Sequence, residues 1–163
     1  MAAIDKLQAL QALTNQLESE LDTARAAQQQ TQAGATHDEN KPENDKDTRA
    51  IEATYLARGQ ARRVVELEQA LLKLNSLEPR QFPPDAPIAL GAIVALEGDD
   101  DDAFWYLLAP AGGGARLELG ATSMTVVTPE SPVGRALLGR REGDDVEIRT
   151  PQGARECSVS TVI

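Results

Sequence analysis

Five carboxylates lie within a short polar segment of the chain: Asp38, Glu39, Glu43, Asp45 and Asp47. Magnesium is a hard cation that prefers oxygen ligands and commonly takes one or two carboxylates from a protein. A second ion beside an existing one can activate water for the hydrolysis of a phosphodiester. The cluster therefore indicates either a magnesium-binding tip or a solvated charged loop, as at the end of many hairpins.

Arginines follow the acidic segment along the chain. Arg58 and Arg62 are spaced one helical turn apart, and Arg49 and Arg63 lie nearby. Without further information, this row indicates a solvated helix face that forms salt bridges with Glu66 and its neighbours.

Neither His37 nor Cys157 completes another kind of site. His37 is the only histidine, and no cysteine or second histidine accompanies it to form a zinc site. Cys157 alternates with Val159 and Thr161 in an extended segment, so we expect its side chain to be buried. A single cysteine excludes an internal disulfide and suits a reducing compartment.

The charge of the chain limits its partners. The net charge is −10 over 163 residues, and binding to phosphates needs a cationic surface, so we expect no binding to free DNA. No apolar run approaches the roughly 20 residues that span a membrane, and the first residues lack the order of a signal peptide. We therefore expect a cytoplasmic protein with no membrane partner.

Two long helices are predicted on either side of the acidic segment. Residues 2–33 contain no proline or glycine, and the pattern stops at Gly34. Helix resumes near Asp47 or Thr48. In both stretches apolar residues recur at steps of three and four: Leu10, Leu13, Leu17, Leu21 and Ala24, then Ile51, Tyr55, Leu56, Val64, Leu67, Leu71 and Leu74.

Two helices of similar length joined by a polar segment predict an antiparallel coiled-coil hairpin over residues 1–76, with its acidic tip at 34–47. Leu17 and Leu67 are expected in the buried seam between the helices. Gly59, inside the second helix, either permits a close approach of the helices or marks a soft point.

The second half of the chain has a different composition. Four prolines fall within residues 77–87, which predicts a semi-rigid linker. Extended segments follow at 88–96, 104–108 and 117–128. With a short helix and a final hairpin, they predict an α+β domain over residues 88–163.

The most specific local pattern runs from Ser131 to Gly153. Ser131 can cap a helix, Pro132 suits its first position, and Gly139 can end it in the left-handed conformation. A turn at residues 142–144 then leads into a terminal β-hairpin. A short helix followed by a hairpin is thus predicted.

The residues Ser-Pro-Val-Gly-Arg-Ala-Leu-Leu-Gly at 131–139 resemble the C-terminal domain of the Gre family of bacterial transcript cleavage factors. That family has Leu where Val133 stands, followed by a Gly-Asp turn, a strand and a Thr-Pro-x-Gly turn. The likeness extends upstream through residues 88–94 and 106–110. It implies an α+β chain: an antiparallel coiled-coil hairpin, then an FKBP-like domain with an antiparallel sheet and one short helix.

The resemblance implies a transcription elongation factor whose hairpin enters the secondary channel of RNA polymerase and stimulates cleavage of backtracked transcript. The tip carboxylates would help to hold Mg²⁺ in the polymerase active site. The polymerase is then the catalyst, so this chain is expected not to be an enzyme, and to meet nascent RNA only within the polymerase complex.

The tip differs from the family pattern, which reads Asp-x-x-Glu-Asn. Glu43 and Asn44 match the Glu-Asn pair, but Asn40 stands where the family has Asp. Asp38 or Glu39 is close enough to supply the missing carboxylate. The candidate ligands of the polymerase-bound ion are therefore Asp38, Glu39 and Glu43.

The resemblance implies two further surfaces. A basic patch on the hairpin would face the RNA or the polymerase, and the C-terminal domain would dock on the outside of the channel. The patch consists of Arg49, Arg58, Arg62 and Arg63, and the docking residues are Ser131, Pro132, Gly134, Arg135, Leu137, Leu138 and Gly139.

Two other functions are compatible with the sequence. One is a Gre-like regulator whose altered tip occupies the channel without stimulating cleavage. The other is a peptidyl-prolyl isomerase, because Gre C-terminal domains are similar in fold to FKBP. That activity needs an aromatic-lined pocket, whereas Phe104, Trp105 and Tyr106 are consecutive and alternate between the faces of a strand.

Overall fold

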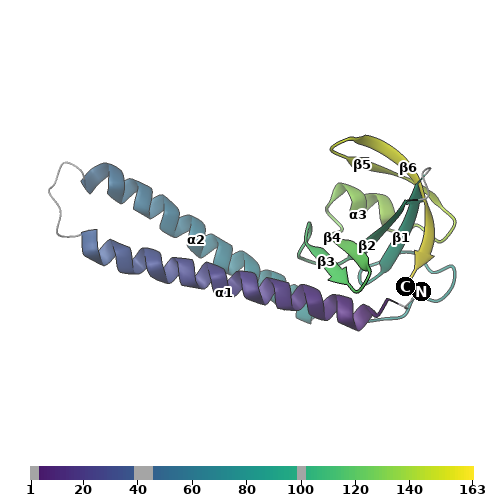
Figure 1. Cartoon of the computed structure of the whole chain (residues 1–163), viewed down its shortest axis with the longest axis horizontal. Coiled ribbons are helices and arrows are strands. Elements are labelled where there is room, and N and C mark those ends of the chain that lie inside the picture. Colours follow the sequence, from purple (N-terminus) through teal and green to yellow (C-terminus); the bar gives the residue numbers. More distant parts are fainter. Residues whose placement is uncertain (1–3, 39–45, 99–101) are drawn as a thin grey trace. The chain divides into compact units, whose positions relative to one another are not determined.

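A computed structural model describes residues 4–38, 46–98 and 102–163 of the chain (Figure 1). For residues 35–38 and 46–47 it describes the backbone only. Two compact units are present: Asn15–Leu71, and Leu72–Ile163 together with the start of the chain through Thr14. The elements in order are α1 Lys6–Asp38, α2 Lys46–Asn75, β1 Ile93–Gly98, β2 Ala103–Leu108, β3 Arg116–Leu119, β4 Thr122–Val127, α3 Pro132–Leu137, β5 Asp145–Thr150 and β6 Gly153–Val162.

The predicted helical hairpin followed by an α+β domain is confirmed. One boundary was predicted wrongly, because α1 continues through Gly34 to Asp38. Glycine lowers helix stability by about 1 kcal/mol relative to alanine but does not end a helix by itself. The space around Gly34 is open, with no atom within 4 Å of an added Cβ.

The seam of the hairpin unit is apolar. Leu17 and Leu21 of α1 and Val64 and Leu67 of α2 are all buried, with Leu17 4% and Leu67 2% exposed. The prediction that Leu17 and Leu67 lie in the seam is confirmed. Removing these side chains from water is the main stabilising contribution to a long, narrow unit of this kind.

The seam does not extend to the beginning of α2. Every residue from 48 to 59 is exposed, including Ile51, Tyr55 and Leu56 at 58%, 69% and 55%. The sequence had placed these three on the apolar stripe, and the structure corrects that placement. A spacing of three and four identifies a helix face, but it does not say whether another helix covers that face.

The C-terminal sheet has six strands in the order β3-β4-β2-β1-β6-β5. It is mixed rather than purely antiparallel, since β2 and β4 run parallel with Trp105 opposite Met124. Residues 117–128, expected as one extended segment, form the β3–β4 hairpin instead. The turn between them uses Gly120 at φ +61°, a conformation that glycine adopts at little cost.

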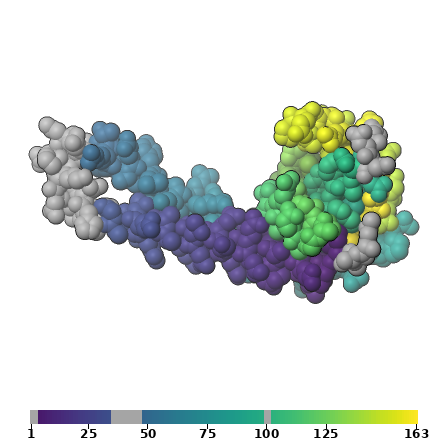
Figure 2. All heavy atoms as spheres, viewed as in Figure 1, coloured from purple at the N-terminus to yellow at the C-terminus, as the bar shows by residue number. Residues whose placement is uncertain are grey.

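The core of this domain lies beneath α3. Leu137 of α3 packs with Val146 and Ile148 of β5 and with buried residues of β1 and β6, including Leu96 and Cys157. The expected burial of Cys157 is therefore confirmed. The β5–β6 hairpin, yellow in Figure 2, forms one edge of the sheet.

The first turns of α1 belong to the same unit as the sheet. Ala9 and Leu13 are fully buried there, and a Cβ added to Gly112 would lie 2.8 Å from Leu13. Lys6 donates to the carbonyl oxygen of Arg80 at 2.6 Å, and its ammonium lies 4.5 Å from the centre of the Phe82 ring. These contacts hold residues 80–82, which follow α2, against the first turn of α1.

Further along, residues 85–88 are hydrogen-bonded to the loop after α3. The backbone N–H of Ile88 donates to the carbonyl oxygen of Arg140 at 2.7 Å, and the Arg141 guanidinium donates to the carbonyl oxygen of Asp85. Asp85 has φ +63°, which few residues other than glycine adopt. These bonds fix the path of the chain into β1.

Candidate functional site

The predicted docking element begins with a helix cap. Ser131 has extended backbone angles, its Oγ accepts from the backbone N–H of Gly134 at 3.0 Å, and Pro132 occupies the first turn. The Ser131 hydroxyl also donates to the carbonyl oxygen of Thr128 at 2.8 Å. One serine therefore joins the start of α3 to the end of β4, as the capping preference predicts.

Three of the seven predicted docking residues hold the element together. Ser131 is the cap, and Gly134 and Leu137 are buried beneath α3. A Cβ on Gly134 would lie 1.8 Å from the carbonyl oxygen of Thr128. These three residues shape the surface without presenting side chains to a partner.

The remaining four residues are exposed and form the outer face of the element. Pro132, Arg135, Leu138 and Gly139 are all exposed, with Leu138 at 39%. Gly139 has φ +77°, so it turns the chain out of the helix as predicted. Arginine is enriched at protein–protein interfaces, and the exposed Leu138 adds apolar surface to this face.

Two more arginines extend this face, and the sequence reasoning did not include them among the docking residues. Arg140 and Arg141 follow Gly139 directly and are exposed. The backbone N–H of Arg141 donates to the Asp144 carboxylate at 2.8 Å, which fixes the turn. The signal was present in the sequence as the Gly-Arg-Arg run. We call Pro132, Arg135, Leu138, Arg140 and Arg141 the α3 face.

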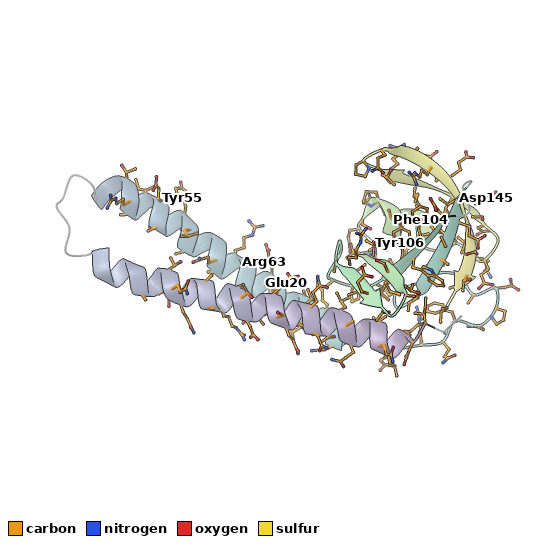
Figure 3. All side chains as sticks on the ribbon, in the orientation of Figure 1. Glu20, Tyr55, Arg63, Phe104, Tyr106 and Asp145 are labelled. Carbon is orange, nitrogen blue, oxygen red and sulfur yellow. The ribbon has the colours of Figure 1, made fainter. Side chains whose placement is uncertain are left out.

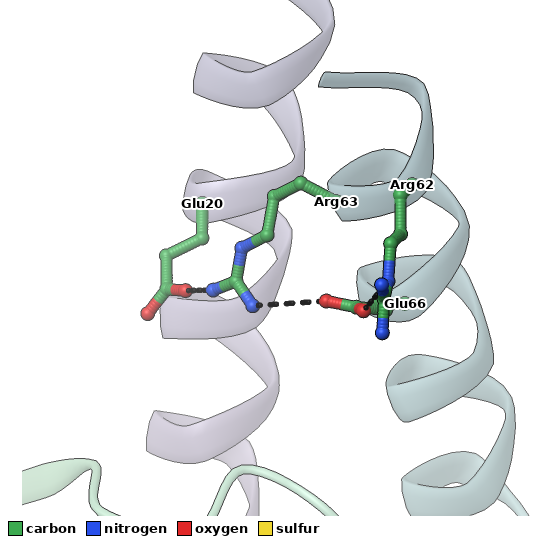
Figure 4. Close-up of polar contacts among 4 residues, drawn as sticks. All are labelled: Glu20, Arg62, Arg63 and Glu66. Carbon is green, nitrogen blue, oxygen red and sulfur yellow. Dashed lines mark hydrogen bonds and ion pairs between the residues drawn. The ribbon is translucent and has the colours of Figure 1, made fainter. Parts of the chain in front are cut away.

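The four arginines of α2 divide into two groups. Arg63 lies 2.7 Å from Glu20 of α1 and 4.0 Å from Glu66, and Arg62 lies 2.9 Å from Glu66 (Figure 4). Figure 3 shows Glu20 and Arg63 on the two facing helices. Exposed pairs of this kind contribute about 0–1 kcal/mol each, so they orient the side chains more than they stabilise the hairpin.

Arg49 and Arg58 form the second group. Both are exposed, and neither pairs with a carboxylate in the part of the chain that the structure describes. Their charges remain available to an outside partner.

The predicted tip ligands lie outside the described side chains. Asp38 is the last residue of α1, and its side chain is left aside, while Glu39 and Glu43 fall within residues 39–45. Among the side chains that the structure describes, no three His, Cys, Asp or Glu residues are grouped to hold a metal ion. The magnesium role of the tip therefore remains a prediction.

The aromatic residues of β2 do not line a common pocket. Phe104 and Tyr106, labelled in Figure 3, pack against the core cluster, and Trp105 alternates to the other face of the strand. Burial, and to a lesser degree the neighbouring Cys157, raises the pKa of Tyr106.

None of the helices within residues 4–38, 46–98 and 102–163 combines the length and the apolar composition of a membrane span.

The α3 face lies in a part of the chain that matches a known protein family. The C-terminal domain of the transcription elongation factors GreA and GreB matches residues 84–163, which include the whole sheet and α3. Residues 84–163 belong to the GreA/GreB family. Factors of this family are not enzymes themselves. The match does not include the helical hairpin.

Curated relatives support the assignment. Over 102 residues, the chain is 32% identical to the transcription elongation factor GreA of Nitrobacter winogradskyi, covering 61% of this chain and 60% of the relative. It is 30% identical to GreA of Streptomyces coelicolor over 97 residues, covering 58% and 55%. The chain thus matches less than two thirds of the length of these GreA proteins.

Solved structures of the transcription factor Gfh1 are also similar. One is 25% identical, covers 93% of both chains and has a TM-score of 0.41. The Thermus aquaticus protein is 22% identical, covers 93% of this chain and 94% of its own, and has a TM-score of 0.39.

Proposed function

We propose that this chain is a GreA/GreB family member that binds RNA polymerase in the bacterial cytoplasm, inserts its hairpin into the secondary channel and stimulates cleavage of backtracked transcript. The observation that carries the proposal is the GreA/GreB match over residues 84–163 in a chain that also has a helical hairpin. The nuclease is the polymerase active site, to which this chain adds ligands for Mg²⁺.

The α3 face is the proposed docking surface on the polymerase. It carries Arg135, Arg140 and Arg141 around the exposed Leu138, in a chain whose net charge is −10. The three guanidinium groups can pair with carboxylates on a partner surface, and Leu138 can pack against its apolar side chains.

Binding to purified polymerase core enzyme tests the docking role. Arg135→Glu with Arg140→Glu in the full chain is expected to weaken binding at least tenfold. Arg116→Glu, at an exposed arginine on β3, is the control for a single charge reversal elsewhere on the domain and should change binding less than twofold. Equal effects of the two charge reversals would remove the α3 face from the proposal.

The chemistry of the tip rests on Glu43 and one more carboxylate. Magnesium holds its water ligands tightly, so a single carboxylate binds it weakly, and a second carboxylate nearby strengthens binding considerably. Asn40 is neutral and is a poor substitute for a carboxylate ligand. We therefore assign the second ligand to Asp38 or Glu39.

The same sequence difference favours one alternative, a secondary-channel regulator without cleavage activity. Cleavage of nascent RNA in a backtracked polymerase complex, at saturating factor, separates the two functions. If the chain stimulates cleavage, Glu43→Ala should abolish stimulation without loss of polymerase binding. If it is a silent regulator, the wild type gives no stimulation, and Asn40→Asp confers it at high magnesium.

A further inference from the structure

α2 presents a regular row of exposed side chains at intervals of four, three, four and three residues. These are Ile51, Tyr55, Arg58, Arg62 and Val65, which we call the α2 stripe. All five are exposed, with Val65 at 48% and the Arg62 side chain at 82%. Tyr55 and Arg63 mark the helix in Figure 3.

The stripe lies on the side of α2 opposite to the seam with α1. At about 100° per residue, it is centred ~180° from the buried or half-buried Gln60, Val64 and Leu67. Its 3.5-residue repeat is the spacing by which one helix packs along another in a coiled coil. α2 thus has two faces suited to a helix, and α1 covers only one of them.

The charge around the stripe indicates what would cover it. Residues 48–66 contain Arg49, Arg58, Arg62 and Arg63, with Glu52 and Glu66 as the acids, a local net charge of 4 − 2 = +2 within a chain of −10. Arg58, at the centre of the stripe, pairs with no carboxylate of the described residues. An acidic helix would supply the missing partner charges.

We propose that the α2 stripe binds an acidic amphipathic helix of a partner protein, with Ile51, Tyr55 and Val65 packing on its apolar face and Arg58 pairing with its carboxylates. The stripe shares Arg58 and Arg62 with the predicted basic patch but no residue with the α3 face or the proposed tip ligands, so its binding can be measured separately from cleavage.

Two other occupants fit the stripe less well. A second copy packed antiparallel on the stripe would pair Ile51 with Val65 and bring Arg58 against Arg58 of that copy, an unfavourable contact of like charges. Single-stranded RNA gains from arginine and from stacking on Tyr55, but it gains nothing from the aliphatic Ile51 and Val65. The apolar ends of the row therefore favour a protein helix.

The test uses the full chain and a fluorescently labelled peptide of about 28 residues, four heptads long, with leucine at heptad positions a and d and glutamate at e and g. Fluorescence anisotropy should give a micromolar Kd. A control peptide of equal charge, with serine in place of the leucines, should bind at least tenfold more weakly. An unlabelled RNA oligonucleotide should not compete for the stripe.

Two substitutions locate the binding surface. Arg58→Glu and Tyr55→Ala should each weaken binding of the leucine–glutamate peptide at least fivefold, while Arg49→Glu, on the other side of the same helix, should change it less than twofold. Arg58→Glu retains helix stability because the introduced carboxylate would lie four residues before Arg62, a favourable ion-pair spacing. Circular dichroism checks that the helices persist.

Several results would overturn this inference. They are no binding of the leucine–glutamate peptide, equal binding of the serine control, or binding unaffected by Arg58→Glu and Tyr55→Ala. Competition by the RNA, or concentration-dependent dimerisation of the chain that Tyr55→Ala abolishes, would assign the stripe to the other occupants instead.

Discussion

A Cβ on residue 134 would collide with the carbonyl oxygen of Thr128, because the two positions would lie 1.8 Å apart. Thr128 follows β4, and Gly134 is in the middle of α3, so the absence of a side chain allows the helix to rest on the end of the strand. The obstructing atom belongs to the backbone and cannot rotate away.

Gly134→Ala should therefore destabilise the domain by about 1–3 kcal/mol or more, since overpacking a rigid contact costs this much. Urea denaturation followed by circular dichroism measures the change. Arg135→Ala, the exposed neighbour on the same helix, should alter the free energy of unfolding by about 0.5 kcal/mol or less. Equal stability of the two variants would show that α3 can move away from Thr128.

Much of this local structure was predictable from the sequence. Ser131, Pro132 and Gly139 act within a few residues of themselves, and their capping and turn preferences determine where α3 begins and ends. The Gly134 contact was not predictable, because it depends on how closely α3 approaches the end of β4, a distance that capping and turn preferences do not determine.

The hairpin shows a second limit of sequence reasoning. Periodic leucines correctly predicted the burial of Leu17 and Leu67. The same periodicity placed Ile51 and Tyr55 on the apolar stripe, although they lie on the opposite side of α2. At about 100° per residue, the nine residues from Tyr55 to Val64 make about two and a half turns, so the angle carried along α2 separates them. Leu56 lies on the side of Val64 and Leu67 and is still 55% exposed, and only the packing of α1 determines that.

Leu17→Ala or Leu67→Ala should each destabilise the hairpin unit by about 2–5 kcal/mol, the usual loss for a leucine removed from a buried site. Leu56→Ala is the matched control, because Leu56 is 55% exposed on the same helix as Leu67 and should change stability by about 0.5 kcal/mol or less. Thermal unfolding measures both. A larger loss for Leu56→Ala would mean that the seam continues to the start of α2.

Gly59 lies beside the end of the covered seam, and no atom lies within 4 Å of an added Cβ. The close-approach interpretation of this glycine is therefore wrong, and the soft-point interpretation remains. Gly59→Ala should stabilise the helix by about 0.5–1 kcal/mol, since alanine has the higher helix propensity. A lower unfolding temperature in a thermal melt would contradict an open, helical site.

Lys6 provides a prediction of pH dependence. Burial and the nearby positive charge of Arg80 lower the pKa of Lys6 from 10.5 to about 8. Between pH 8 and 10.5 the unfolded chain therefore holds a proton that the folded chain has released, and this group makes stability rise with pH. Below pH 8 the unfavourable contribution of the charged amine is constant.

The difference in unfolding free energy between wild type and Lys6→Met isolates this contribution. The free energy of unfolding of the wild type should increase relative to that of Lys6→Met as the pH rises from 8 to 10.5, as measured by urea denaturation at each pH. The same difference for Lys73→Met, a lysine exposed on α2, corrects for the general loss of a positive charge. A corrected difference that falls or stays level over this range would contradict the lowered pKa.

Cleavage of nascent RNA in a backtracked polymerase complex is the most direct measurement of the proposed function. The account predicts that wild type accelerates cleavage, and that simultaneous alanine substitution of Asp38, Glu39 and Glu43 abolishes the acceleration while polymerase binding is retained. Robust cleavage that is unaffected by the triple substitution would contradict a tip that delivers carboxylates to the metal ion.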